Sequence, residues 1–370
     1  MISFAKGLSL FAVLLFLLIG ISYAQQKKNT AITDIVHTVF EEGDPFNGVI
    51  LIAKEGKIIE EAAFGVRDFE TNTPLQTSDI FELASVSKQF TAMVIMQLAS
   101  QGKLKYDDEV EKYIQIPYKN ITIRQLLNHT SGLPDYQAIM DQHWDKSKVA
   151  DNAIIIEYLN RFAPPANFSP GEKYDYSNTG YVLLASIAEK ASGRDFTEML
   201  RTMVFRRFNM KNTDLRTPAE KKSLVNLAYG HIKQPENGHY KKADSFPSSN
   251  YTIWLGNREG PGRISSTAHD LLNWDRALYD QKFFTPAMRN EAFKPALLNN
   301  NTLSPYGFGW ELEEDEKGGK VVQHSGDNPG YKTEIVRFID TDRTIILLCN
   351  NAHERFEKLL AALKKYTASL

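Results

Sequence analysis

Strand patterns stand at both ends of this chain, separated by a long stretch of helical patterns. Two strand-like segments, 47–54 and 57–65, are joined by Glu55 and Gly56, which predicts a β-hairpin with glycine at the turn. Beyond Tyr306 the apolar period changes to two, as in consecutive antiparallel strands. These later segments are 308–312, 320–324, 331–338 and 343–349. Because strands bury their apolar faces by joining a sheet, we expect one antiparallel sheet formed by N- and C-terminal strands and flanked by helices.

The stretch between the strands has the three- and four-residue apolar spacing of helices. Its clearest helical segments are 152–162, 181–191, 196–204 and 267–280. A helix that begins near Ser85 and ends at Gly102 has a wide apolar face, so we expect it at the centre of the fold. The predicted fold class is α/β, of the α+β kind, with an inserted all-helical domain. We expect a sheet domain built from 35–84 and 300–370, and a mainly helical domain over 85–299.

Residues 1–24 differ from the rest of the chain. A positive charge precedes the largely apolar residues 7–21, and Ser22 and Ala24 place small residues where a signal peptidase cleaves. This pattern predicts a signal peptide over 1–24, a linker over 25–34 and an exported protein, periplasmic or secreted. The alternative is an uncleaved membrane anchor, although the apolar run is short for a membrane span. In that case the protein would contact the membrane only through this segment.

Composition and residue spacing argue against several functions. The formal net charge is -2 over 370 residues, which gives no support for nucleic-acid binding. Cys349 is the single cysteine, within a buried strand pattern, so no internal disulfide is expected. His129 and His269 lack metal-ligand spacing, and the sequence has no His-Glu-x-x-His motif or Cys/His cluster. We therefore predict no metal and no cofactor.

Ser85 and Lys88 lie three residues apart at the start of the expected central helix, so their side chains share one face. A buried lysine amine loses its proton more readily than its free pKa of about 10.4 suggests, and it can then deprotonate a serine hydroxyl. The helix N-terminus adds partial positive charge and free N–H groups beside a developing oxyanion. Alone, this spacing more often marks a solvated helix face, so it needs support elsewhere in the chain.

Two later polar stretches offer that support. Tyr176 and Asn178 lie in an aromatic-rich loop before a helix. Nearby amines can lower a tyrosine pKa towards a proton-relay value, and asparagine can present its amide to a substrate. The alternative is a core tyrosine beside an asparagine that caps the helix. His324 and Gly326 stand at the end of a strand, where histidine can donate a hydrogen bond and glycine lets a substrate backbone approach. The alternative is a buried histidine that caps a β-turn.

Together these elements resemble the motifs of the serine β-lactamase and penicillin-binding-protein superfamily, in its class C-like branch. That branch also holds DD-peptidases, D-aminopeptidases and esterases. Residues 85–88 match its Ser-x-x-Lys motif and 176–178 its Tyr-x-Asn motif. Residues 324–326 stand in the place of Lys-Thr-Gly, in the His-x-Gly form of several non-lactamase members, and 127–134 looks like a further landmark. The resemblance covers roughly residues 35–368 and implies a β-lactamase/transpeptidase-like fold with its site at the domain junction.

The resemblance also implies roles for the motif residues. Ser85 would be the acylated nucleophile and Lys88 its proton acceptor. Tyr176 would shuttle protons between the serine, the leaving group and later the attacking water. Asn178 would orient the substrate amide, and His324 would hold Tyr176 in its working state or contact the substrate.

The implied oxyanion hole is formed by the Ser85 N–H and one further N–H between Gly326 and Tyr331. His324 departs from the lactamase pattern, because an imidazole with a pKa of about 6.5 is mostly neutral at pH 7 and binds a substrate carboxylate weakly. We therefore expect an exported serine hydrolase that acts through an acyl-enzyme on an ester, amide or D-amino-acid peptide bond of a small molecule or peptide. The alternatives are a true class C-type β-lactamase or DD-carboxypeptidase, and a non-catalytic penicillin-binding or sensor module.

Overall fold

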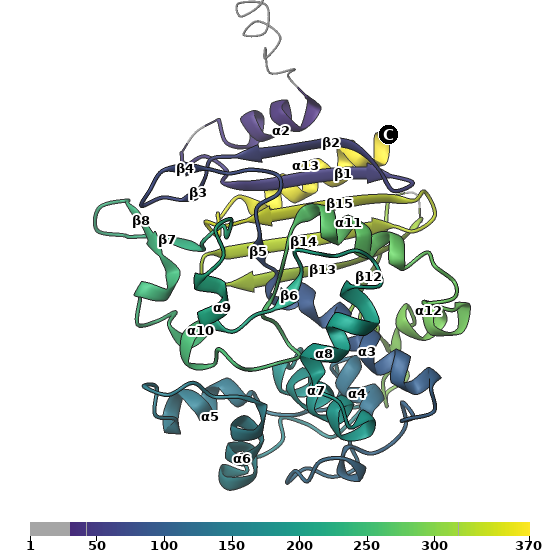
Figure 1. Ribbon diagram of the computed structural model, residues 1–370. Helices are drawn as coiled ribbons and strands as arrows, with labels where there is room; N and C mark the ends of the chain where they lie inside the picture. The colour runs from purple at the N-terminus through teal and green to yellow at the C-terminus, as the bar shows by residue number, and fades with distance from the viewer. Residues whose placement is uncertain (1–29, 42, 317) are drawn as a thin grey trace, which may run out of the picture.

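A six-stranded antiparallel sheet crosses the molecule in the order β12-β13-β14-β15-β1-β2 (Figure 1). The computed structural model describes residues 30–370 except 42 and 317, so the expected signal peptide at 1–24 lies outside the described residues. The strands of the sheet are β1 (Gly48–Lys54), β2 (Lys57–Phe64), β12 (Glu311–Glu314), β13 (Lys320–Asn328), β14 (Tyr331–Phe338) and β15 (Arg343–Cys349). The N-terminal hairpin joins the C-terminal strands through the pairing of β1 with β15, which confirms the expected sheet and fold class.

Helices cover both faces of this sheet, with α2 and α13 on one face and α11 on the other (Figure 1). The helices are α2 (Ala31–Val39), α3 (Lys88–Ser100), α4 (Ile123–Leu127), α5 (Tyr136–His143), α6 (Asn152–Phe162), α7 (Asn178–Ser192), α8 (Phe196–Leu200), α9 (Pro218–Lys222), α10 (Tyr251–Trp254), α11 (Ala268–Ala277), α12 (Pro286–Ala292) and α13 (Phe356–Ser369). In β1, Ile50 and Ile52 join the core under α2 and α13, whereas Val49 and Leu51 join the core that includes α3 and α11. Because both faces are covered, β1 is a continuous apolar run.

Helix α3 lies at the centre of the helical part, as its wide apolar face predicts (Figure 1). Ten of its 13 residues are buried, and it packs against α7 and α8. The chain leaves the helix at Gly102, whose φ of 70° lies in the left-handed region that glycine adopts without strain. A helix enclosed in this way can hold its first residue, Lys88, out of contact with water.

Two features differ from what the sequence patterns indicate. Helix α2 begins at Ala31, inside the range 25–34 expected to be a linker, because the Thr30 hydroxyl accepts a hydrogen bond from the Thr33 N–H and caps the helix. The stretch 85–299 contains short strands as well as helices. They are β6 (Asp214–Leu215), β7 (His231–Lys233), β8 (Tyr240–Lys242), β9 (Ile264–Ser266) and β10 (Ala296–Leu297). Within the described part of the chain, no helix is long and apolar enough to cross a membrane.

Candidate active site

A tight turn carries Ser85. The short strand β5 (Phe81–Glu82) pairs with β9, and a 3-10 turn over Ala84–Ser87 then leads into α3. Ala84 has a φ of 48°, a left-handed conformation that residues with a Cβ rarely adopt, so the backbone bends sharply just before Ser85. The Ser85 Oγ lies 3.0 Å from the Lys88 Nζ. The two side chains therefore meet, as their three-residue spacing predicts.

Lys88 is fully buried, and its Nζ has two further oxygen partners. It donates to the Asn178 Oδ1 at 2.9 Å and to the carbonyl oxygen of Pro261 at 2.7 Å. Burial lowers the pKa of Lys88 well below 10.5, and the positive charge of Arg258 lowers it further. A neutral amine has two N–H bonds and one lone pair. Since Asn178 and Pro261 accept the two N–H bonds, the lone pair is left for the hydroxyl proton of Ser85.

Tyr176 reaches the same serine from the loop before α7. Its hydroxyl faces Ser85, and its ring lies under the Lys88 amine at 4.7 Å from ring centroid to Nζ. Contrary to our expectation, the pKa of Tyr176 is raised well above 10, because desolvation of the hydroxyl outweighs the opposite effect of Ser85, even though 38% of the residue is exposed. Tyr176 is thus a protonated phenol at neutral pH.

Asn178 is the first residue of α7, and Ser177 rather than Asn178 caps that helix. The Ser177 hydroxyl accepts a hydrogen bond from the Gly180 N–H. This leaves the Asn178 side chain to contact Lys88 through its oxygen, with its amide nitrogen available to a substrate. The alternative of an asparagine cap is therefore wrong.

His324 is fully buried in β13, and both of its ring nitrogens are occupied. The Nδ1 lies 2.6 Å from the Ser325 carbonyl oxygen, and the Nε2 lies 2.7 Å from the Tyr306 hydroxyl. The carbonyl can only accept, so Nδ1 carries the proton and Tyr306 donates to Nε2. Burial lowers the pKa of His324 to about 3, which keeps the ring neutral. The ring centroids of His324 and Tyr176 lie 6.2 Å apart. His324 lies within β13, so the alternative of a histidine that caps a turn is wrong.

Gly326 brings β13 against the turn that carries Ser85. A Cβ at this position would lie 2.3 Å from the Leu83 carbonyl oxygen and 2.3 Å from the Thr333 Oγ1. The group that approaches Gly326 closely is therefore the chain's own backbone. This close packing sets the distance between the strand and Ser85.

The outer edge of β13 is open beside this turn. Pairing with β12 ends at Gln323, so residues 324–328 pair only with β14. The Ser325 hydroxyl donates to the Glu311 carboxylate at 3.3 Å, and the Ser325 N–H faces the same carboxylate, so this N–H points to the outer edge. Because N–H directions alternate along a regular strand, the Asp327 N–H also points outward. An extended substrate could lie along this edge.

A cluster of aromatic rings that the sequence motifs did not reveal packs beside Tyr176. His129 is fully buried at the centre of this cluster, and its ring centroid lies 4.2 Å from that of Tyr176, 4.6 Å from that of Tyr306 and 5.1 Å from that of Tyr181. Its Nδ1 accepts the Ser177 N–H at 3.0 Å, and burial lowers its pKa well below 6.5. His129 therefore fixes the loop that presents Tyr176. The landmark 127–134 contains this histidine, but spacing alone did not indicate its role.

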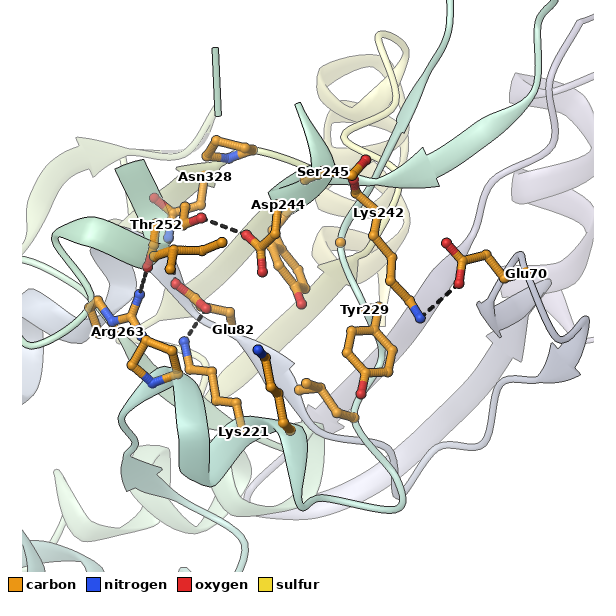
Figure 2. Close-up of a pocket in the computed structure, with 18 residues that line it drawn as sticks. Glu70, Glu82, Lys221, Tyr229, Lys242, Asp244, Ser245, Thr252, Arg263 and Asn328 are labelled. Carbon is orange, nitrogen blue, oxygen red and sulfur yellow. Dashed lines mark hydrogen bonds and ion pairs between the residues drawn. The ribbon is translucent and has the colours of Figure 1, made fainter. Parts of the chain in front are cut away.

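A cavity of about 440 Å³ lies beyond the end of β13, close to the turn that carries Ser85. Figure 2 shows Lys221 joined to Glu82, and Arg263 joined to the Thr252 backbone. The second Glu82 oxygen accepts a hydrogen bond from Asn328 at 2.8 Å. Burial lowers the pKa of Lys221 to about 8 despite its carboxylate partner. Across residues 30–41, 43–316 and 318–370, no three His, Cys, Asp or Glu side chains gather as metal ligands.

Comparisons with known proteins agree with this geometry. Residues 36–368 match the family model described as Beta-lactamase. The chain is 39% identical over 326 residues to penicillin-binding protein 4* of Bacillus subtilis, covering 86% of this chain and 72% of that protein. It is 25% identical over 305 residues to a D-aminopeptidase of Brucella anthropi, covering 82% of this chain but only 56% of that protein.

A solved structure shares the fold. The penicillin-binding protein from Bacillus halodurans superposes with a TM-score of 0.77 at 23% identity, over 91% of this chain and 99% of that chain. Identity at this level supports the fold alone, whereas the family match and the Bacillus subtilis relative extend over most of the sequence. The chain therefore belongs to the β-lactamase family of serine hydrolases.

Proposed function

We propose that this protein is an exported serine hydrolase that acts through an acyl-enzyme on an ester, amide or D-amino-acid peptide bond. The observation that carries the proposal is the Lys88 amine, which is buried, has a lowered pKa and lies 3.0 Å from the Ser85 hydroxyl. Export is supported by the sequence pattern of residues 1–24 alone.

In the proposed acylation step, Lys88 accepts the hydroxyl proton while the Ser85 Oγ forms a bond to the substrate carbonyl carbon. The N–H groups of Ser85 and Asp327 would hold the oxyanion, because the Asp327 N–H points to the outer edge of β13 beside the turn that carries Ser85. When the intermediate collapses, the Tyr176 phenol gives its proton to the leaving group and recovers one from Lys88. The bond to the leaving group breaks, and the acyl-enzyme remains on Ser85.

In the proposed deacylation step, the same groups act on water. A water molecule loses a proton to Lys88, either directly or through the Tyr176 phenol, which passes its own proton to Lys88 as it accepts one, and the water oxygen bonds to the ester carbon. The bond from that carbon to the Ser85 Oγ then breaks, and Oγ takes the proton back from Lys88. The free amide nitrogen of Asn178 would hold the carbonyl of an amide substrate. Each proton returns to its original site at the end of the cycle.

The state of His324 bears on which substrates fit. Its nitrogens are taken by Tyr306 and Ser325, so it has neither charge nor a free donor for the carboxylate of a penicillin or a D-Ala-D-Ala peptide. This supports a neutral ester, an amide or a D-aminopeptidase-like substrate over the β-lactamase and DD-carboxypeptidase alternatives. The similarity to a D-aminopeptidase agrees with that preference.

The proposal is tested by incubation with a fluorophosphonate probe followed by mass spectrometry. We expect one adduct on Ser85 and none in Ser85→Ala. A panel of p-nitrophenyl esters, nitrocefin, D-Ala-D-Ala peptides and D-amino-acid p-nitroanilides then assigns the substrate class. If Ser85 stays unlabelled under conditions that label a related hydrolase, the non-catalytic sensor alternative replaces the proposal.

A further inference from the structure

A buried arginine without a carboxylate partner among the described residues lies close to the proposed catalytic groups. Arg258 is only 6% exposed, and its Nε and Nη1 are buried with no hydrogen-bond partner among the described residues. Arg258 also forms no ion pair with any carboxylate of the residues that the structure describes. A buried guanidinium is strongly disfavoured unless its donors are satisfied, so its lone state points to a group that binds there.

The acidic side chains around Arg258 already have other partners. Glu82 accepts from Asn328 with one oxygen and pairs with Lys221 through the other. Asp135 caps α5 by accepting the Gln137 N–H at 2.8 Å. The charge of Arg258 acts on Glu82, and the charges of Arg258 and Asp135 both act on Lys88. Neither carboxylate accepts a hydrogen bond from the guanidinium.

The guanidinium lies close to the turn that carries Ser85. Arg258 is three residues before Pro261, whose carbonyl binds the Lys88 amine. A Cβ on Gly262 would lie 4.0 Å from the Arg258 Nη2 and 3.6 Å from the Ala84 carbonyl oxygen. The Arg258 Nη2 and the Ala84 carbonyl oxygen therefore both lie beside Gly262.

The position of Arg258 along β13 identifies the part of the substrate that it would meet. Tyr176, the proposed donor to the leaving group, lies on the side of His324. Three residues further along β13, the charge of Asp327 acts on Tyr251, whose ring centroid is 5.9 Å from the Arg258 Cζ. With the leaving group beside Tyr176, the acyl portion of the substrate would extend along β13 towards Asp327, the end at which Tyr251 and Arg258 lie.

We propose that Arg258 is a specificity residue that binds a carboxylate on the acyl side of the substrate. The inference rests on the proposed function, since an acyl side exists only if Ser85 is acylated. A guanidinium presents parallel N–H donors that match a carboxylate, and a buried pair of this kind is stronger than an exposed one. This carboxylate differs from the leaving-group carboxylate that His324 fails to hold.

Three pairs of substrates test the proposal, each differing by one carboxylate and its neutral amide. They are the p-nitroanilides of D-glutamate and D-glutamine, of D-aspartate and D-asparagine, and of N-succinyl- and N-succinamoyl-D-alanine. In at least one pair the wild type should favour the carboxylate by roughly tenfold or more in kcat/KM. Arg258→Gln should bring that ratio close to one, and Arg258→Lys should keep part of the preference. Arg194→Gln, at an exposed arginine, should keep the wild-type ratio.

Other outcomes overturn the proposal. Wild-type ratios near one in all three pairs would overturn the proposal before any variant is made. Thermal unfolding shows whether Arg258→Gln is folded. An equal loss for both members of each pair, with a shifted pH profile, would mean that Arg258 acts only through its charge on Lys88. If Ser85 takes no fluorophosphonate label and no substrate turns over, the proposed function fails and this inference falls with it. Labelled, active enzyme without a carboxylate preference would contradict the inference alone.

Discussion

Lys88 and Tyr176 contact the same serine, yet their surroundings shift their pKa values in opposite directions. Removal from water disfavours the charged form of each group, which is the ammonium for lysine and the phenolate for tyrosine. The pKa of Lys88 is therefore lowered and that of Tyr176 is raised. Both shifts favour the neutral forms, which are an amine that can accept a proton and a phenol that can donate one. A single physical cause thus separates a base from an acid within one site.

Replacing Lys88 with arginine should reduce kcat/KM for a p-nitrophenyl ester by several orders of magnitude. A guanidinium keeps its proton in this pH range, and groups that act as a unit are each nearly indispensable. In the wild type, kcat/KM should rise with pH through a midpoint well below 10.5, because the amine must be neutral to act. Steady-state rates across the pH range provide the measurement, with Lys103→Arg at an exposed lysine as the control. Near-wild-type turnover in Lys88→Arg would remove Lys88 from the role of base.

Replacing His324 with lysine should raise kcat/KM for penicillins or D-Ala-D-Ala peptides relative to neutral esters. An ammonium opposite a partly buried carboxylate contributes about 1–3 kcal/mol, or about one to two powers of ten. Ester activity should fall, because the change removes the acceptor of the Tyr306 hydroxyl. His324→Gln, which keeps a neutral acceptor, is the control. An unchanged ratio of the two specificity constants would show that His324 does not determine this preference.

At the scale of the elements, the apolar period of two predicted the strand bounds well wherever the apolar alternation extends over the whole length of the strand pairing. The bounds of β14 and β15 agree with the predicted segments 331–338 and 343–349. The segment 320–324 was too short, because β13 runs on to Asn328. Residues beyond His324 are more polar, since they line an open edge, but their backbones still pair with β14. Strand pairing depends on the neighbouring strand, so the local apolar pattern cannot predict where the pairing ends.

Strand β13 and the turn that carries Ser85 form one packed unit, and Gly326→Ala tests their contact. The added methyl group would meet the Leu83 carbonyl oxygen at 2.3 Å, so the strand or the turn must move. We expect a loss of stability of about 1–3 kcal/mol. A displaced nucleophile should also lower kcat by about a hundredfold.

Urea unfolding and ester kinetics measure the two effects of Gly326→Ala. Gly262→Ala is a matched control for stability, because its Cβ would lie 3.6 Å from the Ala84 carbonyl oxygen, an ordinary contact. Wild-type stability and turnover in Gly326→Ala would contradict the close packing of strand and turn.

At the scale of the whole molecule, the site is assembled from segments that lie far apart in the sequence. The motifs indicated Ser85, Lys88, Tyr176 and Asn178, and the structure brings these four side chains together. Tyr306, His129 and Arg258 could not be found in the same way, because their positions depend on tertiary contacts that residue spacing does not encode. The direction of the Tyr176 pKa shift was missed for the same reason, since burial is a property of the folded chain.

The buried neutral histidine His324 should make folding stability depend on pH. Its pKa is about 3 in the folded protein against 6.5 when unfolded, so between these values the unfolded chain binds a proton that the folded chain excludes. Its contribution to stability is present above pH 6.5 and should fall by about 2 kcal/mol between pH 7 and pH 5. Glu259 acts in the opposite direction, because burial raises its pKa from 4.5 to about 7.

The effect of His324 must therefore be isolated by comparing variants. Urea unfolding at both pH values should show a pH dependence about 2 kcal/mol smaller in His324→Gln than in the wild type, and unchanged in His37→Gln, at an exposed histidine. Equal pH dependence in all three proteins would contradict the burial of a neutral imidazole in β13.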